Sequence, residues 1–141
     1  MFVVFDLDGT LALTEHREHF LKAEPKDWRG FYAACDGDGP CLPVINTLRA
    51  LAVSGHRVEI WSGRSAEVAD KTRAWLCAHG LAFVNARYRA EGDHQPDTKL
   101  KAAWLDAEKA PPDLVFEDRA SMVAMYRERG IVCAQVAPGD F

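Results

Sequence analysis

The chain begins with a short apolar run, Phe2–Phe5, that stops abruptly at two aspartates separated by one residue. Such a run is typical of a strand buried on both faces, whereas Asp6 and Asp8 carry like charges that resist burial side by side. A cation bound between the two carboxylates would offset this repulsion. The pair also fits an Asx turn or a helix cap, so the motif alone leaves both interpretations open.

Further apolar runs follow at intervals that leave room for helices. Four more strands are expected at residues 56–62, 81–86, 114–117 and 131–136. Helices are expected at residues 42–53, 66–79, 97–108 and 121–129, and several of them end next to a glycine. This alternation predicts an α/β fold: an open, mostly parallel, Rossmann-like sheet with helices on both faces.

One segment, residues 14–43, departs from this rhythm. It is rich in proline and glycine, and it contains the aromatic residues Phe20, Trp28, Phe31 and Tyr32. We expect a short ordered insertion after the first strand and no large cap, with aromatic rings that either stack on a base or sugar or pack in the core. With 141 residues, 48% of them apolar, the chain has the size of a single domain, residues 1–141.

Composition excludes several classes of protein. No basic leader is present and no run approaches the ~20 apolar residues of a membrane helix, so a soluble, cytoplasmic protein is expected. A net charge of −4 argues against a broad basic surface for nucleic acid. The four cysteines form no C-x-x-C pair, which favours free thiols over a zinc or redox site. They are Cys35, Cys41, Cys77 and Cys133.

Polar residues follow the ends of four of the expected strands. In an open parallel sheet, ligands bind beyond the carboxyl ends of the strands, so these positions are the candidate site. Carboxylates from two strands, a hydroxyl group and cationic side chains together suit a hard cation such as Mg²⁺ and a phosphate group. The residues in question are Asp6, Asp8, Ser62, Gly63, Arg64, Asp97, Lys99, Lys101, Glu117 and Asp118.

The motif D-L-D-G-T-L at residues 6–11 resembles the haloacid dehalogenase (HAD) superfamily of phosphotransferases. The similarity extends to W-S-G-R at residues 61–64, a downstream lysine and the acidic pair Glu117-Asp118, all in the superfamily's order. The resemblance implies a phosphatase with the α/β fold expected above.

A narrower similarity concerns the 3′-phosphatase domain of bacteriophage polynucleotide kinase. It is carried by Arg17, by the S-G-R segment, by residues 89–101 and by the tail at residues 116–141. Glu117 stands where that phosphatase has an aspartate, and Gln95 stands where it has a basic residue. The chain contains no G-x-x-x-x-G-K-[ST] loop, so a kinase half is not expected.

By this resemblance, Asp6 is the nucleophile that forms an aspartyl-phosphate, and Asp8 is the general acid and base. Mg²⁺ would be held by the Asp6 carboxylate, the backbone carbonyl of Asp8 and the side chain of Asp118. Gly9 would let the chain turn sharply, and the Thr10 hydroxyl or nearby amides would orient Asp8.

The remaining roles concern the substrate phosphate. The resemblance implies that Ser62 binds the phosphoryl group and that a lysine neutralises it. We select Lys101 over Lys99, because Lys101 keeps the D-x-x-x-K spacing after Asp97. Asp97 either positions that lysine or caps the helix that it begins.

The expected substrate site is completed by two arginines, one glycine and Asp97. Arg17 and Arg64, with Gly63 between Ser62 and Arg64, are expected to hold the substrate phosphate. Isolated arginines of this kind more often form surface ion pairs, which is the alternative interpretation.

These expectations converge on a Mg²⁺-dependent phosphomonoester hydrolase acting on 3′-phosphate ends of polynucleotides or nucleotides. The alternative enzyme is a 5′-nucleotidase of free nucleoside monophosphates. A receiver-like phospho-aspartate signalling domain would carry its acceptor on the third strand, which opposes that interpretation. An inactive binding module would have little reason to keep Asp6, Asp8, Ser62, Lys101 and Asp118 together.

Overall fold

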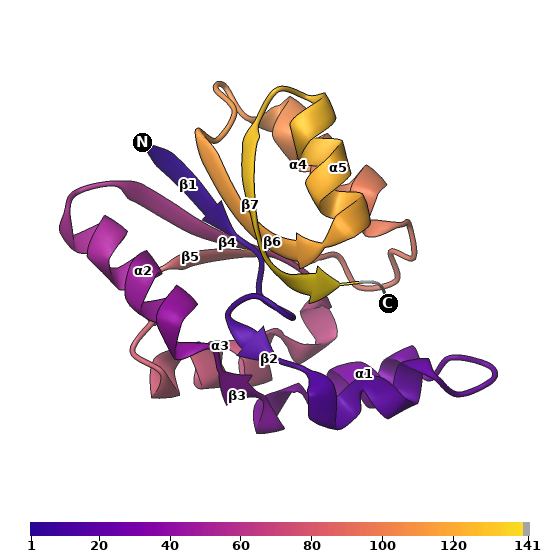
Figure 1. Ribbon diagram of the computed structural model, residues 1–141. Coiled ribbons are helices and arrows are strands. Elements are labelled where there is room, and N and C mark those ends of the chain that lie inside the picture. Colours follow the sequence, from indigo (N-terminus) through magenta and orange to yellow (C-terminus); the bar gives the residue numbers. More distant parts are fainter. Residues whose placement is uncertain (140–141) are drawn as a thin grey trace.

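The computed structural model describes residues 1–139 and contains a sheet of five parallel strands in the order β5-β4-β1-β6-β7 (Figure 1). The strands are β1 (Phe2–Phe5), β4 (Arg57–Ser65), β5 (Asn85–Arg89), β6 (Leu114–Arg119) and β7 (Val132–Gly139). The predicted α/β class with a parallel sheet is confirmed. The end of the tail motif, Asp140 and Phe141, lies outside the described residues.

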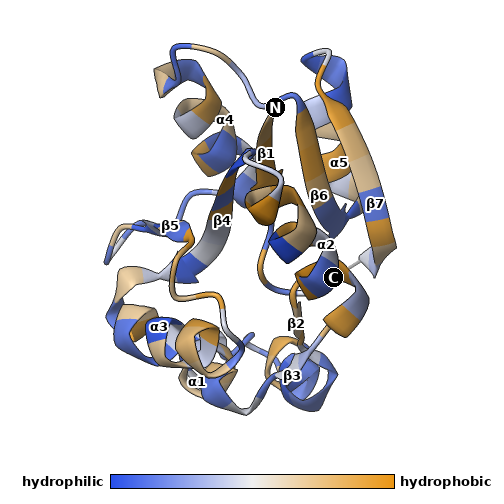
Figure 2. Ribbon diagram, turned by 90° about the vertical axis from the view of Figure 1, so that its left-hand side faces the viewer, coloured by the Kyte–Doolittle hydropathy of each residue, from blue (hydrophilic) through white to orange (hydrophobic). Residues whose placement is uncertain are grey.

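Helices cover both faces of this sheet, α2 and α3 on one side and α4 and α5 on the other (Figure 1). Their bounds are Leu42–Val53 for α2, Ala69–Ala78 for α3, Asp97–Ala107 for α4 and Ala120–Glu128 for α5. Side chains of β1 alternate between the two cores: Val3 and Phe5 pack on the α2 and α3 side, and Val4 packs on the other. Figure 2 shows β1 and β6 as largely hydrophobic, as expected for strands in the middle of a covered sheet.

The insertion forms a set of short elements near the carboxyl end of β1 (Figure 1). They are β2 (Ala12–Leu13), the 3-10 helix η1 (Glu15–Leu21), α1 (Trp28–Ala33), the 3-10 helix η2 (Cys35–Gly37) and β3 (Gly39–Pro40). Antiparallel pairing of β2 with β3 brings the two ends of the insertion together. The segment therefore leaves the sheet and returns to it at the same place.

The strand expected at residues 81–86 is wrong in position. Leu81 and Val84 are buried, but they belong to a turn in which Leu81 N donates to Leu76 O at 2.7 Å and Val84 N donates to Leu81 O at 3.1 Å. The strand β5 begins at Asn85 instead. Apolar residues in this partly buried turn have the same composition as a buried strand, so the apolar pattern could not separate the two.

Two further observations concern the chain as a whole. Within residues 1–139, no helix has both the length and the apolar character needed to cross a membrane. The four cysteines are free, as predicted.

Candidate active site

Three carboxylates and one lysine meet beyond the carboxyl end of β1. Because Phe5 of β1 pairs with Phe116 of β6, the residues that follow them come side by side. One oxygen from each of Asp6, Glu117 and Asp118 lies within 4.8 Å of the other two. Lys101 of α4 donates to Asp6 Oδ1 and, at 3.1 Å, to Glu117 Oε2.

The charges in this cluster do not balance, because three buried acids face one lysine. Burial, reinforced by Glu117, raises the pKa of Asp6 well above its usual range and raises that of Asp118 to about 7. Burial alone would lower the pKa of Lys101, but Asp6 and Glu117 outweigh it and raise that pKa. Oxygen donors with excess negative charge are what a hard divalent cation requires, so these residues fit Mg²⁺.

The side chain of Glu117 binds both the backbone at the end of β6 and Lys101. Its Oε1 accepts hydrogen bonds from the backbone N–H of Asp118 at 3.1 Å and of Arg119 at 3.3 Å, while Oε2 holds Lys101. The residue that departs from the phage-type pattern is thus fully engaged in positioning Lys101 and the end of β6.

Gly9 allows the turn after the acid pair. Its φ is +83°, in the region that favours glycine, and a Cβ there would overlap the carboxylate of Asp118. The close approach of this backbone to Asp118 therefore requires the absence of a side chain.

Asp8 is bound by two arginines through a single oxygen. Its Oδ1 accepts from Arg17 Nη2 at 2.6 Å, from Arg64 Nε at 2.9 Å and from Arg64 Nη2 at 2.6 Å. Burial would raise the pKa of Asp8, but Arg64 and Arg17 outweigh burial and hold it below its usual value. The guanidinium groups of Arg17 and Arg64 are fully buried, so they do not form surface ion pairs. Their ion pairs are with carboxylates of the protein itself.

Sequence reasoning missed the second acid that these arginines share. Asp38, directly after η2, accepts from Arg17 Nε at 2.7 Å and Arg17 Nη2 at 2.6 Å, and from Arg64 Nη2 at 2.7 Å. His16 Nε2 lies 2.8 Å from the same carboxylate. Two buried arginines around one aspartate require another negative charge, but the sequence does not show that Arg17 and Arg64 are buried.

The S-G-R segment lies within the last part of β4. Ser62 is at the predicted end of this strand, and Gly63 and Arg64 lie beyond it. Ser62 is buried, and its Oγ accepts from the backbone N–H of Arg64 at 3.2 Å. The carbonyl of Gly63 accepts from Arg89 Nε at 2.9 Å, and Gly63 lines the pocket above the acids. Of the two kinds of group expected to orient Asp8, the Thr10 hydroxyl is wrong, because this buried hydroxyl has no hydrogen-bond partner among the described residues.

Asp97 begins α4 but does not cap it. The N-cap residue is Pro96, with no side-chain cap bond, so the capping alternative is wrong. The Asp97 carboxylate instead accepts from Arg89 and, at 3.0 Å, from Arg119 Nη1, and it lines the pocket. Lys99 is exposed at the surface, which leaves Lys101 as the lysine that the structure brings to the acids.

The pocket is lined by both acidic and aromatic side chains. Asp6, Asp8, Asp118 and Lys101 are among its lining residues. The aromatic residues Trp28, Phe31 and Tyr32, all from α1, also line it.

Fold and site together place this protein in a class, the HAD-type phosphatases. Similar folds occur in a HAD-like hydrolase, SP0104, from Streptococcus pneumoniae (TM-score 0.64, 14% identity, 95% of this chain and 83% of that one). They also occur in a class C acid phosphatase from Bacillus anthracis (TM-score 0.62, 17% identity, 82% and 51%). Within the class, the chain belongs to the polynucleotide kinase PNKP phosphatase domain family, which it matches over residues 1–141.

A stronger structural similarity is to a chain of the Pnkp1/Rnl/Hen1 RNA repair complex. The TM-score is 0.84 at 27% identity, and the match covers 99% of this chain. It covers only 43% of that chain, so the protein described here spans less than half of its relative's length.

Proposed function

We propose that this phosphatase is a Mg²⁺-dependent phosphomonoesterase that acts through an aspartyl-phosphate on Asp6 and prefers terminal 3′-phosphates of polynucleotides or nucleotides. The observation that carries the proposal is the position of Asp6, which is buried beside Asp118, bonded to Lys101 and accessible from the pocket floor.

The first step follows from the position of Asp6. One Asp6 oxygen attacks phosphorus, a new P–O bond forms, and the bond from phosphorus to the leaving alcohol oxygen breaks. The ammonium group of Lys101 lies next to the attacking carboxylate, where it can neutralise charge on the phosphoryl oxygens. Mg²⁺, held by the Asp6 carboxylate, the Asp8 carbonyl and Asp118, would lessen the repulsion between the two anions.

Asp8 serves the leaving group and the water. Its Oδ1 is occupied by three arginine N–H groups, so Oδ2 is the oxygen at which a proton can be exchanged. Because the two arginines lower the pKa of Asp8, this carboxylate must take up a proton before it acts as the acid. Asp8 donates that proton to the leaving oxygen. It then takes a proton from the water that attacks the aspartyl-phosphate, which releases phosphate and restores Asp6.

The choice of substrate rests on the family and on the pocket. The family is named for polynucleotide kinase, and the relative with 27% identity takes part in an RNA repair complex. The insertion after β1 is short, so a polymer end can approach the pocket. A net charge of −4 suits a protein that binds an end and not a long backbone.

The test is phosphate release from matched oligonucleotides phosphorylated at the 3′ or the 5′ end, from 3′- and 5′-mononucleotides and from common sugar phosphates. We expect the highest kcat/KM on 3′-phosphates, with none in an Asp6→Asn variant. Preference for 5′-mononucleotides would make the enzyme a nucleotidase instead. Activity confined to sugar phosphates would refute the nucleic-acid assignment.

A further inference from the structure

We propose that Trp28 stacks on the nucleobase next to the reacting phosphate, and that α1 presents it as part of an aromatic shelf made of Trp28, Phe31 and Tyr32. The inference rests on the proposed function and deepens it, because it names the group by which the pocket recognises a nucleotidic substrate.

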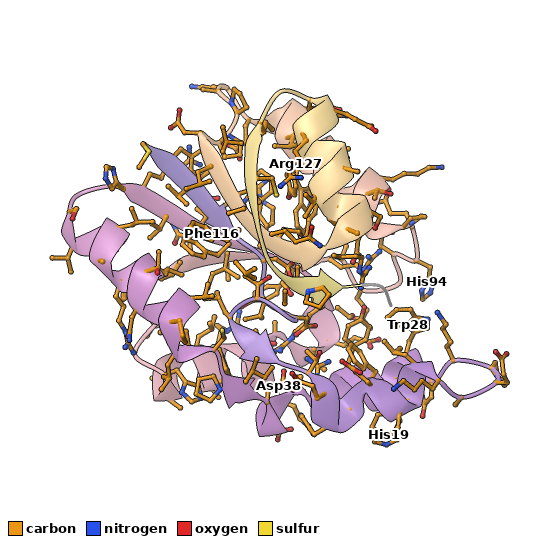
Figure 3. All side chains as sticks on the ribbon, viewed as in Figure 1. His19, Trp28, Asp38, His94, Phe116 and Arg127 are labelled. Carbon is orange, nitrogen blue, oxygen red and sulfur yellow. The ribbon has the colours of Figure 1, made fainter. Side chains whose placement is uncertain are left out.

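The three rings differ in exposure although they line the same pocket as the catalytic acids. Phe31 is 3% exposed and belongs to the core, whereas Trp28 is 43% exposed. Figure 3 shows the Trp28 side chain projecting from α1 toward the sheet. The Lys26 ammonium lies 6.0 Å from the centroid of this ring, at the outer limit of a cation–π contact. The exposed part of the ring is therefore open to a stacking ligand beside the pocket.

The geometry of the shelf suits a flat ligand. The rings of Trp28 and Tyr32 lie one helical turn apart, with centroids 6.0 Å apart and planes inclined by 30°. Phe31 contacts both rings edge-on, at 6.0 Å and 85° to Trp28 and at 5.7 Å and 65° to Tyr32. Every nucleobase has a π face for such a surface, whereas a sugar phosphate has none.

Contacts on both sides of α1 hold the shelf in place. Asp27 caps the helix by accepting the backbone N–H of Gly30 at 2.8 Å. The Tyr32 hydroxyl donates to the carbonyl of Gly63 in β4 at 3.3 Å, which ties α1 to the strand that carries the S-G-R segment. Binding therefore need not order the shelf first, and this lowers the entropic cost of stacking.

The shelf also connects to the groups around Asp8. The Arg17 guanidinium carbon lies 4.0 Å from the centroid of the Phe31 ring, and the same guanidinium binds Asp8. Trp28, which would bind the base, and Asp8, which would protonate the leaving group, are thus connected through the contacts of Phe31 and Arg17. A base stacked on Trp28 would fix its own phosphate relative to that acid.

The experiment compares two oligonucleotides with a terminal 3′-phosphate that differ only in whether the terminal nucleotide carries a base or is abasic. The readout is the ratio of kcat/KM for the base-bearing substrate to that for the abasic one. Stacking is worth ~1–3 kcal/mol per base, so Trp28→Ala should lower this ratio about 5- to 150-fold. Trp28→Phe, which keeps a π face, should restore most of it.

Phe83→Ala is the matched control, because Phe83 is also an exposed aromatic residue (58%) but does not line this pocket. It should leave the ratio unchanged. An unchanged ratio in Trp28→Ala, which includes equal losses on both substrates, would refute stacking on Trp28 and leave the phosphatase assignment intact.

A binding measurement keeps the inference testable if the catalytic assignment fails. In the Asp6→Asn background, a 3′-phosphorylated oligonucleotide should quench tryptophan fluorescence more when Trp28 is present than in Trp28→Phe. Equal quenching in the two proteins would refute stacking. Absence of 3′-phosphate turnover by the wild type would instead refute the proposed function.

Discussion

Lys99 and Lys101 lie two residues apart in α4, but only one of them is expected to take part in catalysis. Lys101 is 2% exposed and bonded to Asp6 and Glu117, whereas Lys99 is exposed. Lys101→Ala should reduce kcat on the order of 10²-fold or more, because it removes the cation proposed to stabilise the transferring phosphoryl group. Lys99→Ala should retain most activity in the same steady-state assay. The reverse pattern would assign the catalytic role to Lys99 in place of Lys101.

Asp38 should act as a positioning residue for the general acid. Asp38→Asn leaves two buried arginines facing only Asp8, so we expect a loss of ~3–5 kcal/mol in the free energy of unfolding. The loss of activity should be larger on alkyl phosphates, whose leaving group needs a proton, than on aryl phosphates with a good leaving group. Asp36→Asn, on the same turn but exposed, should change neither value. Equal losses on the two substrate types would assign Asp38 a purely structural role.

The sequence identified those site residues that stand next to a recognisable sequence pattern, and it missed those whose partners are distant in the chain. Asp6, Asp8 and Asp118 stand out because each follows an apolar run at a strand end. Asp38 has no such neighbour, since its partners come from η1 and β4 and meet only after the insertion folds back. The burial of Arg17 and Arg64 was likewise not visible from their residue types, which usually lie at the surface.

The turn between β1 and β2 can be tested at Gly9. Gly9→Ala adds a Cβ that overlaps the Asp118 carboxylate, and it does so at a φ of +83° that alanine tolerates poorly. We expect a fall in the free energy of unfolding of at least ~1 kcal/mol together with a severe loss of turnover. Gly55→Ala has the same φ but nothing within 4 Å of the added Cβ, and should lose stability without a comparable loss of turnover. Equal activity losses in the two variants would show that the approach to Asp118 is unimportant.

Elements with strong periodicity were predicted well, and those set by tertiary contacts were not. The helix Leu42–Val53 has the predicted bounds. Both β4 and β6 run past their predicted ends, to Ser65 and Arg119, because their polar ends still pair with neighbouring strands. The path of residues 14–43 depends on the pairing of β2 with β3. Strands of two residues are too short to give a recognisable pattern in the sequence, so this pairing could not be predicted.

The balance of charge at the acid cluster predicts a pH-dependent response to metal. The pKa of Asp118 is raised from 3.8 to about 7, so its contribution to stability is present at low pH and is lost as the pH rises through that value. Asp6 acts in the same direction. In the proposed site Mg²⁺ binds the ionised carboxylates, so the rise in Tm that it causes should be larger at about pH 8 than at about pH 5.

Thermal unfolding with Mg²⁺ or with a chelator measures this response. Asp118→Asn should reduce both the effect of Mg²⁺ and its dependence on pH. A Mg²⁺ effect of the same size in that variant would place the cation elsewhere. The exposed residue Asp106 offers a control, because Asp106→Asn removes a carboxylate outside the cluster.

The most direct test is to trap the phosphorylated enzyme and locate the phosphoryl group. Asp8→Asn should slow hydrolysis of the intermediate, so this variant is mixed with a good-leaving-group aryl phosphate and Mg²⁺, quenched in acid and digested for mass spectrometry. We predict one added phosphoryl group on the peptide that contains Asp6, and none in an Asp6→Asn, Asp8→Asn double variant. A phosphoryl group on another residue, or substrate turnover by a protein that lacks Asp6, would contradict the mechanism.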